Sequence, residues 1–377
     1  MKTTHLIPTN EPILDGNEKK YVLETLDSNW ISIGKKTAEL EEKFAEYVGT
    51  KYAVACTSGT TAIHLSLTAL DIGPGDEVII PDFNIIVSAR MILITGAKPV
   101  LVDVDKYWCI DPGKIEEKIT KRTRAIIPVH IYGNPANMDE IMKIARKHKL
   151  FVIEDACAAH GAQVNEQKVG SIGNLGCFSL YTSKTVIAGE GGIVTTNDKK
   201  LADKIYSLRN QGFGLENRFR HEHLGFNYRV TDLQSAIALA QVEQIDKKVQ
   251  RKRDIAKNYQ DLLQNIKEIE PHSNPPWGKS GFWMYGIVLK DSFGRTPSEV
   301  KYLLKERGIG SEYFFTPMSK QKIFIKGDSR FSNFPDIRGE YPMSNYFSDR
   351  GLYLPTGLGI TRKTQKLIIK NLLDLRR

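Results

Sequence analysis

The stretch MDEIMKIARKHKLFVIED, residues 138–155, carries the pattern that decides the fold. Its first part, Met138–His148, spaces its apolar residues as a helix does, and its second part, Leu150–Ile153, is a short continuous apolar run. The stretch therefore predicts a helix followed by a strand that is covered on both faces. Two carboxylates, Glu154 and Asp155, stand at the end of that strand.

The same alternation extends through much of the chain. The other strand-like runs are Tyr52–Cys56, Glu77–Ile80, Pro99–Val104, Ala125–Val129, Gly176–Leu180 and Ile193–Thr196. Helical stretches lie between many of them, for example Thr61–Leu70. Strands that alternate with helices predict a mainly parallel sheet with right-handed crossovers.

The two ends of the chain have other patterns. An N-terminal arm contains helical stretches at Glu18–Leu26 and Ala38–Val48, and after about Asn210 the alternation stops. There follow one or two long helices at Asp232–Ile266, a strand near Met284–Leu289 and a helix near Pro297–Arg307. We predict a large α/β domain at residues 1–235 and a smaller C-terminal α+β domain at residues 236–377.

The composition is that of a soluble globular protein, with 377 residues of which 41% are hydrophobic and 26% charged. No apolar run approaches the roughly 20 residues that span a bilayer, and Met1–Pro12 does not have the apolar core of a signal peptide. The four cysteines show no CxxC spacing, which favours free thiols in a reducing cytoplasm. We expect no membrane partner and no metal site.

The formal net charge of +9 has three interpretations. A solvated basic surface is the one we favour, attraction to anionic substrates such as nucleotide diphosphates is the second, and nucleic-acid binding is the third. The densest basic run, KKVQRKR at Lys247–Arg253, falls on a predicted long helix and has no interleaved aromatic residues to stack on bases. We therefore expect no nucleic-acid partner.

Two candidate cofactor segments follow the first strands, where open α/β sheets bind ligands. Ser58, Gly59 and Thr60 precede a helix, and small hydroxyl residues with a glycine at a helix start suit a phosphate. A plain helix cap is the alternative. Phe83 follows the next strand and could stack on a cofactor ring, or it could be a core phenylalanine.

The third candidate segment ends in Asp155. A buried carboxylate is costly unless a cation or hydrogen bonds compensate it, and a protonated pyridine nitrogen is such a cation. For Glu154 we expect a supporting hydrogen-bonding role. His160 could position Asp155 or could be a satisfied core histidine, and the sequence leaves both open.

The fourth candidate segment ends in Lys184, which follows the strand Gly176–Leu180. A surface lysine is the common case, but the apolar run before it favours a partly buried amine with a lowered pKa, as Schiff-base chemistry needs. Ser179 could donate to the phosphate. Phosphate loop, aromatic, aspartate and lysine thus occur in this order, each after a strand.

The chain resembles the DegT/DnrJ/EryC1/StrS family of sugar aminotransferases in the order and spacing of its motifs. The motifs are NEP (residues 10–12), SGT (58–60), GDEVIIP (75–81), GAKPVLVDVD (96–105), PVHIYG (128–133), IEDACAAHGA (153–162), VGSIGNLGCFSLYTSK (169–184), GEGG (189–192) and GFNYRVTDLQSAI (225–237). Within the family the chain looks most like the perosamine synthases. DGNEKKYVLETLDSNWIS (residues 15–32), HIYG (residues 130–133) and SEYFFTP (residues 311–317) carry this second likeness.

The resemblance implies an aspartate-aminotransferase-like (PLP type I) fold, with a mainly parallel seven-stranded sheet flanked by helices. It implies pyridoxal 5'-phosphate (PLP) bound to Lys184, with L-glutamate as amino donor and a nucleotide-linked 4-keto-6-deoxyhexose as acceptor. It also implies a homodimer with shared active sites, in which Asn227 reaches the cofactor phosphate of the neighbouring subunit. The residues implied to border the sugar nucleotide are Trp30, Ser32, Lys35, Tyr313 and Phe315.

Three positions depart from the family pattern. Ala158 stands where the family commonly has glutamine or glutamate, Glu312 where it often has arginine, and Ser319 where it often has histidine. The first departure removes a contact to the cofactor ring. The other two leave open the sugar and how it is held.

Other functions compete with this one. Amination at C3 of the sugar uses the same cofactor chemistry, and the sequence does not separate it from amination at C4. A PLP-dependent sugar dehydratase would carry histidine in place of Lys184. A PLP-binding regulatory protein would need an added recognition module, for which the α/β pattern leaves no room. The nucleotide and the pathway are also open.

Overall fold

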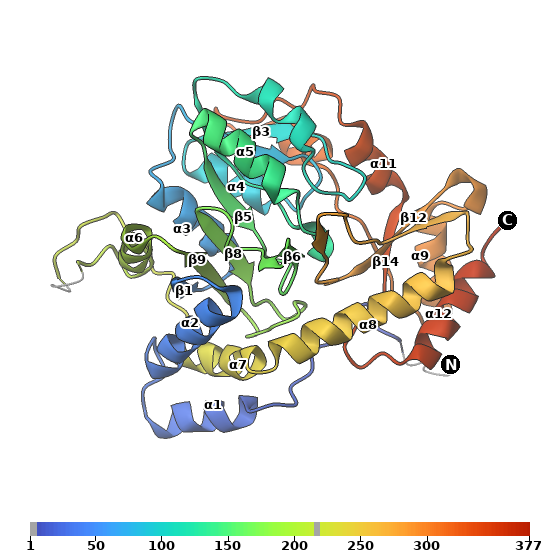
Figure 1. Cartoon of the computed structure of the whole chain (residues 1–377), viewed down its shortest axis with the longest axis horizontal. Coiled ribbons are helices and arrows are strands. Elements are labelled where there is room, and N and C mark those ends of the chain that lie inside the picture. Colours follow the sequence, from blue (N-terminus) through green and yellow to red (C-terminus); the bar gives the residue numbers. More distant parts are fainter. Residues whose placement is uncertain (1–5, 215–218) are drawn as a thin grey trace.

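The computed structural model of the chain describes residues 6–214 and 219–377, and a seven-stranded sheet forms its centre (Figure 1). Its strands are β1 (Tyr52–Cys56), β2 (Glu77–Pro81), β3 (Lys98–Val102), β4 (Thr123–Ile126), β5 (Phe151–Asp155), β8 (Leu175–Ser179) and β9 (Gly192–Thr196). Their order is β1-β9-β8-β5-β4-β2-β3. Only β9 runs antiparallel to its neighbours, so the sheet is mainly parallel.

Each strand-like run in the sequence coincides with one of these strands, which confirms the predicted sheet. The ends differ by at most three residues, and the most useful difference is at β5. This strand continues through Asp155 instead of ending at Ile153, so that the aspartate is its last residue. The position of the Asp155 side chain is therefore fixed by the sheet itself.

Helices cover the sheet on both faces. One face carries α2 (Lys35–Val48), α5 (Met138–His148) and α7 (Asp232–Val242), and the other carries α3 (Gly59–Ala69), α4 (Val87–Ile94) and α6 (Lys199–Arg209). Along β1, Ala53 and Ala55 face the first layer while Val54 and Cys56 face the second. Side chains alternate between the faces of a strand, so a continuous apolar run is what two covered faces require.

Two helices connect the ends of the chain to this core. Helix α1 (Glu18–Asp27) of the N-terminal arm packs on α7. The predicted stretch Asp232–Ile266 is two helices, α7 and α8 (Ile245–Leu263). Figure 1 shows α8, in yellow, running from α7 towards the C-terminal part of the chain.

The C-terminal part is built on a four-stranded antiparallel sheet of order β10-β12-β14-β13. Its elements are β10 (Ile269–Pro271), β12 (Tyr285–Leu289), β13 (Glu312–Tyr313), β14 (Gly351–Leu354), α9 (Pro297–Glu306), α10 (Lys322–Lys326), α11 (Pro342–Arg350) and α12 (Arg362–Leu373). A small third sheet contains β6 (Gln163–Val164), β7 (Gln167–Lys168) and β11 (Gly278–Lys279).

The division of the chain at residue 235 stays a prediction. It falls inside α7, which packs on α1 and α2. A core of its own lies between α8, α9, α12 and the four-stranded sheet, whereas Met318, Phe324 and Tyr341 pack in the core beside α3 and α4. The C-terminal residues thus contribute to both cores.

Two further findings concern the described residues as a set. None of the helices within residues 6–214 and 219–377 is long and apolar enough to cross a membrane. Within the same ranges, no group of three or more His, Cys, Asp or Glu side chains could hold a metal ion. The four cysteines carry free thiols. The first five residues of the N-terminal segment interpreted above lie outside the described ranges.

Candidate active site

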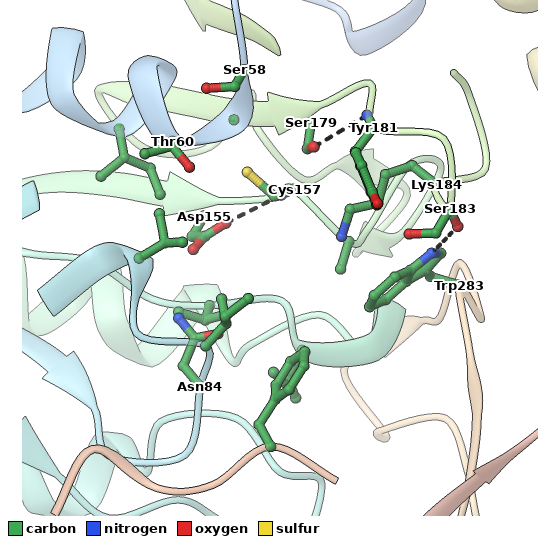
Figure 2. A pocket seen from close by; sticks show the side chains of 18 of the residues that line it. Ser58, Thr60, Asn84, Asp155, Cys157, Ser179, Tyr181, Ser183, Lys184 and Trp283 are labelled. Atoms are coloured by element: carbon green, nitrogen blue, oxygen red, sulfur yellow. Dashed lines mark hydrogen bonds between the residues drawn. The ribbon is translucent and has the colours of Figure 1, made fainter. Parts of the chain in front are cut away.

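A cavity of about 310 Å³ opens beside the carboxyl ends of the parallel strands. Its walls come largely from the residues that follow β1, β2, β5 and β8, which are far apart in the sequence and belong to the same sheet. Figure 2 shows Asp155, Cys157 and Lys184 facing the same space, with the start of α3 on one side and Trp283 on the other. This is where open α/β sheets bind ligands.

The start of α3 forms one end of the cavity. Ser58 caps the helix, and its Oγ accepts a hydrogen bond from Thr61 N at 3.1 Å. A Cβ at Gly59 would lie 2.7 Å from Cys157 Sγ and 2.8 Å from Ser179 Cβ, so only glycine lets the helix approach this closely. The first N–H groups of a helix have no intrahelical acceptor and attract anions. The cap therefore does not conflict with the predicted phosphate role of this helix start.

Asp155 lies at the base of the cavity and is 4% exposed. Its Oδ2 accepts from Ser88 Oγ at 3.0 Å and its Oδ1 accepts from Cys157 N at 3.2 Å. Both donors are neutral, and no Lys, Arg or His side chain of residues 6–214 and 219–377 lies within ion-pair distance of this carboxylate. A buried carboxylate that opens onto a cavity without a cation fits a ligand that brings one.

Lys184 lies opposite, with its side chain half-buried. Its Nζ is 3.6 Å from the centroid of the Trp283 ring. Removal from water lowers the pKa of the Lys184 amine to about 8, while the nearby Cys157 and Asp155 act in the opposite direction. The amine is therefore much closer to its neutral, nucleophilic form than an exposed lysine at the same pH.

Comparisons with known proteins show the family of the chain. The model of the DegT/DnrJ/EryC1/StrS aminotransferase family matches residues 12–373. The chain belongs to this family. The GDP-perosamine synthase of Caulobacter vibrioides is 44% identical over 311 residues, which are 81% of this chain and 84% of that protein. The GDP-perosamine synthase of Escherichia coli O157:H7 is 37% identical over 352 residues, or 93% of each chain.

A solved structure extends the comparison to the fold. DesV of S. venezuelae, determined in complex with a ketimine intermediate, superposes with a TM-score of 0.90 at 29% identity and covers 98% of each chain. The family and the fold are those that the sequence predicts. The chain is a PLP-dependent aminotransferase.

The residues of the cavity fit PLP. The start of α3 and the hydroxyls of Ser58, Thr60 and Ser179 would hold the phosphate, and Asp155 would hold the protonated ring nitrogen. Lys184 would hold the aldehyde carbon. Every one of these predicted residues lines the cavity, as does Gly59.

Phe83 was predicted to contact the cofactor, but it does not line the cavity. It is fully buried, and its ring packs against those of Tyr132, Phe314 and Phe347. It is a core phenylalanine, the alternative that the sequence left open. Side chains alternate along β2, and this alternation turns Phe83 to the same core as Ile79. Asn84 and Ile85 line the cavity in this region.

Glu154 and His160 are both buried and do not line the cavity. Glu154 is fully buried, and it accepts from His130 Nε2 at 3.0 Å and from the N–H groups of Gly170, Ile172 and Gly173. It therefore holds the loop before β8, the hydrogen-bonding role expected for it. His160 packs 5.5 Å from Phe178, and burial lowers its pKa to about 3. This is the environment of a neutral core histidine.

The predicted substrate residues of this aminotransferase divide into two groups. Phe315 lines the cavity, and its N–H donates to Tyr132 Oη at 2.9 Å. The other four do not line the cavity and lie exposed at the surface of the chain: Trp30, Ser32, Lys35 and Tyr313. Asn227, which was predicted to bind the cofactor phosphate of the neighbouring subunit, is also exposed and does not line the cavity. Trp30 is 61% exposed. The structure of one chain thus brings most of the predicted cofactor residues together and leaves most of the predicted substrate residues apart.

The three departures from the family pattern have local explanations. Ala158 lines the cavity with a methyl group only. Glu312 pairs with Lys301, whose Nζ also lies 4.2 Å from the Tyr313 ring centroid. Ser319 donates its N–H at 2.7 Å and its hydroxyl at 3.0 Å to the Asp82 carboxylate. That pair of bonds fixes the segment after Phe315 to the end of β2.

Sequence reasoning missed several cavity residues. They are Asn84, Cys157, Tyr181, Ser183, Glu190 and Trp283. Cys157, Ser183 and Glu190 stand inside motifs quoted above, so their proximity to Asp155 and Lys184 in the sequence was a usable signal. Trp283 had no such signal, because it comes from the C-terminal part of the chain and reaches the cavity only through tertiary packing.

Proposed function

We propose that this aminotransferase moves the amino group of L-glutamate to the C4 keto carbon of a nucleotide-linked 4-keto-6-deoxyhexose, giving a perosamine-type product. The observation that carries the proposal is that Lys184, Asp155 and the start of α3 open onto one cavity. Two relatives that are named GDP-perosamine synthases support the choice of C4 and of a nucleotide sugar.

The chain's own residues have distinct tasks in this reaction. Bound PLP supplies an electron sink for the carbon that loses its proton. Lys184 would hold the cofactor, and its amine would take the proton from the substrate carbon and return it. Asp155 keeps a proton on the ring nitrogen. The lowered pKa of Lys184, about 8, lets its amine both accept and return a proton near neutral pH.

The second substrate must enter the same cavity after glutamate has left as 2-oxoglutarate, so ping-pong kinetics are expected. The exposed Trp30, Ser32, Lys35 and Asn227 support a homodimer in which a neighbouring subunit completes each site. Asn227 would bind the partner's cofactor phosphate, and the loop with Trp30 would border the partner's sugar nucleotide. We place the enzyme in the cytoplasm, where free thiols persist.

A substrate panel tests the function. The purified enzyme with L-glutamate would be offered GDP-, dTDP- and UDP-linked 4-keto-6-deoxyhexoses and a 3-keto sugar nucleotide, with product structure read by mass spectrometry and NMR. Nitrogen at C4 of one of the 4-keto sugars is the expected result. Amination of the 3-keto compound alone would replace the proposal by the C3 alternative.

A further inference from the structure

Side chains of the basic run on α8 donate hydrogen bonds to backbone carbonyl groups of the same chain. Lys248 Nζ donates to Ile13 O at 3.2 Å, Arg251 Nε donates to Leu358 O at 3.1 Å, and Arg253 Nη2 donates to Gly161 O at 2.7 Å. These side chains therefore hold the N-terminal arm, the segment before α12 and the loop after β5 against one helix. Several side chains of this run are therefore bonded within the chain and do not belong to a solvated surface.

Lys252 belongs to the same run on α8 and is only 1% exposed. Its Nζ donates to Thr356 O at 2.7 Å, Asn10 Oδ1 at 3.2 Å and Trp283 O at 3.2 Å. These three neutral oxygens use all three donors of an ammonium group. Within residues 6–214 and 219–377 no carboxylate lies at ion-pair distance from Lys252. Burying an ammonium group without a carboxylate partner is costly, and removal from water lowers the pKa of Lys252 to about 7.

Two of these three partners, Asn10 and Trp283, also contact the residue next to Lys184. Asn10 Nδ2 and Trp283 Nε1 both donate to the carbonyl oxygen of Ser183, the residue before Lys184, the second bond at 2.5 Å. The same Trp283 presents its ring to Lys184 Nζ. Figure 2 shows the bond from Trp283 to Ser183 beside the Lys184 side chain.

We propose that Lys252 is a positioning residue for Lys184. It fixes the Asn10 side chain and the Trp283 backbone, and these in turn fix the Ser183 carbonyl and the surface on which the Lys184 amine rests. Lys252 does not line the cavity and touches neither substrate nor cofactor. It acts at a distance by keeping the amine within reach of the reacting carbon, where small displacements cost much of the rate.

The first test replaces the ammonium by an apolar group of similar length, Lys252→Met. Lys247→Met is the matched control, because Lys247 belongs to the same run and is exposed. In the PLP-loaded enzymes, we expect Lys252→Met to slow the half-reaction with glutamate by about ten- to a hundredfold, with little change in the KM for glutamate. The pH midpoint of the bound cofactor's visible absorption should also shift, whereas Lys247→Met should match the wild type in both.

A second pair of variants keeps the test decisive if Lys252→Met does not fold. Asn10→Asp retains an acceptor for Lys252 but loses the amide donor to Ser183, and Asn10→Ala loses both. If the route to Lys184 runs through Asn10, both variants slow the half-reaction and shift the absorption midpoint. Wild-type rates and midpoints in folded Asn10→Asp and Asn10→Ala would overturn the proposal, as would a folded Lys252→Met that changes only the melting temperature.

The proposal rests on the proposed attachment of the cofactor to Lys184. A separate portion of each sample is therefore reduced with borohydride and mapped by peptide mass. An unlabelled Lys184 in the wild type would overturn the function itself. A labelled Lys184 with unchanged variant kinetics would overturn only the role of Lys252.

Discussion

The inner and outer halves of the active site differ in how much of them one chain builds. The inner half, with Asp155, Lys184 and the start of α3, is enclosed and hydrogen-bonded within a single subunit. The outer half, with Trp30, Lys35 and Asn227, lies exposed on the same subunit. Under the proposed function, the contacts to the PLP ring and the first proton transfer depend on the fold of each chain, whereas the phosphate contact of Asn227 and recognition of the sugar nucleotide depend on assembly.

The largest expected effect is the loss of the inner half's amine. Lys184→Ala should abolish transamination with any sugar nucleotide, because no other side chain at the cavity offers an amine to hold the cofactor and move the proton. Product formation from glutamate, followed by mass spectrometry, measures it, with Lys200→Ala on the exposed start of α6 as the control. Turnover by Lys184→Ala at the wild-type rate would contradict the assignment.

Mixing subunits tests whether the two halves come from different chains. Lys184→Ala carries a lesion in the inner half and Asn227→Ala one in the outer half, and each homodimer should be nearly inactive. After the two are unfolded and refolded together, one site of each mixed dimer contains neither lesion, so about a quarter of the wild-type activity should return. If the mixture stays as inactive as its parents, each site belongs to one chain.

The lowered pKa of Lys184 gives the inner half a pH signature. With a pKa of about 8, the Lys184 amine is mostly protonated at any pH below 8. Only its neutral form attacks an aldehyde. The rate at which added PLP attaches to the cofactor-free protein should therefore rise about tenfold per pH unit below pH 8 and level off above it. Stopped-flow absorbance measures this rate, and a rise that continues unchanged to pH 10 would show an unperturbed lysine.

A methyl group at Gly59 should disturb the inner half alone. A Cβ there overlaps Cys157 and Ser179, so we expect Gly59→Ala to lower the free energy of unfolding by about 1–3 kcal/mol and to weaken PLP retention. Gly73→Ala is the control, because a Cβ at Gly73 meets only Thr95 O at 3.5 Å. Denaturant unfolding and dialysis measure the two effects. Equal stability of both variants would show that α3 can move away from β8.

The smallest expected effect lies in the outer half. Trp30→Ala should raise the KM for the sugar nucleotide about tenfold, as loss of one apolar contact of 1–2 kcal/mol would do, and leave the half-reaction with glutamate unchanged. Steady-state and single-turnover kinetics separate the two. A slower glutamate half-reaction would move Trp30 into the inner half.

Most of the inner half could be predicted from the sequence because the sheet does the assembly. Ser58, Asp155 and Lys184 each follow an apolar run, and strand ends of a parallel sheet meet at one edge. Phe83 also follows a strand, but its position in the alternation of β2 turns it into the core. The position of a residue after a strand does not by itself show to which face of the sheet its side chain points.

Tertiary packing explains what the sequence could not reveal. Trp283 and Asn10 reach Ser183 from opposite ends of the chain, with no local pattern to announce the contact. The basic run of α8 was visible as charge, but its partners are backbone carbonyls, which any sequence supplies. The charge of these side chains therefore did not reveal that some of them are buried against backbone carbonyl groups.

One covalent bond tests the central claim most directly. Native protein loaded with PLP would be reduced with borohydride, digested and mapped by mass spectrometry, with attention to Lys184 and to Lys252, whose pKa burial lowers to about 7. The account predicts a single phosphopyridoxyl group on the peptide that contains Lys184, and none on Lys252. A cofactor-loaded sample in which Lys184 is unmodified would contradict it.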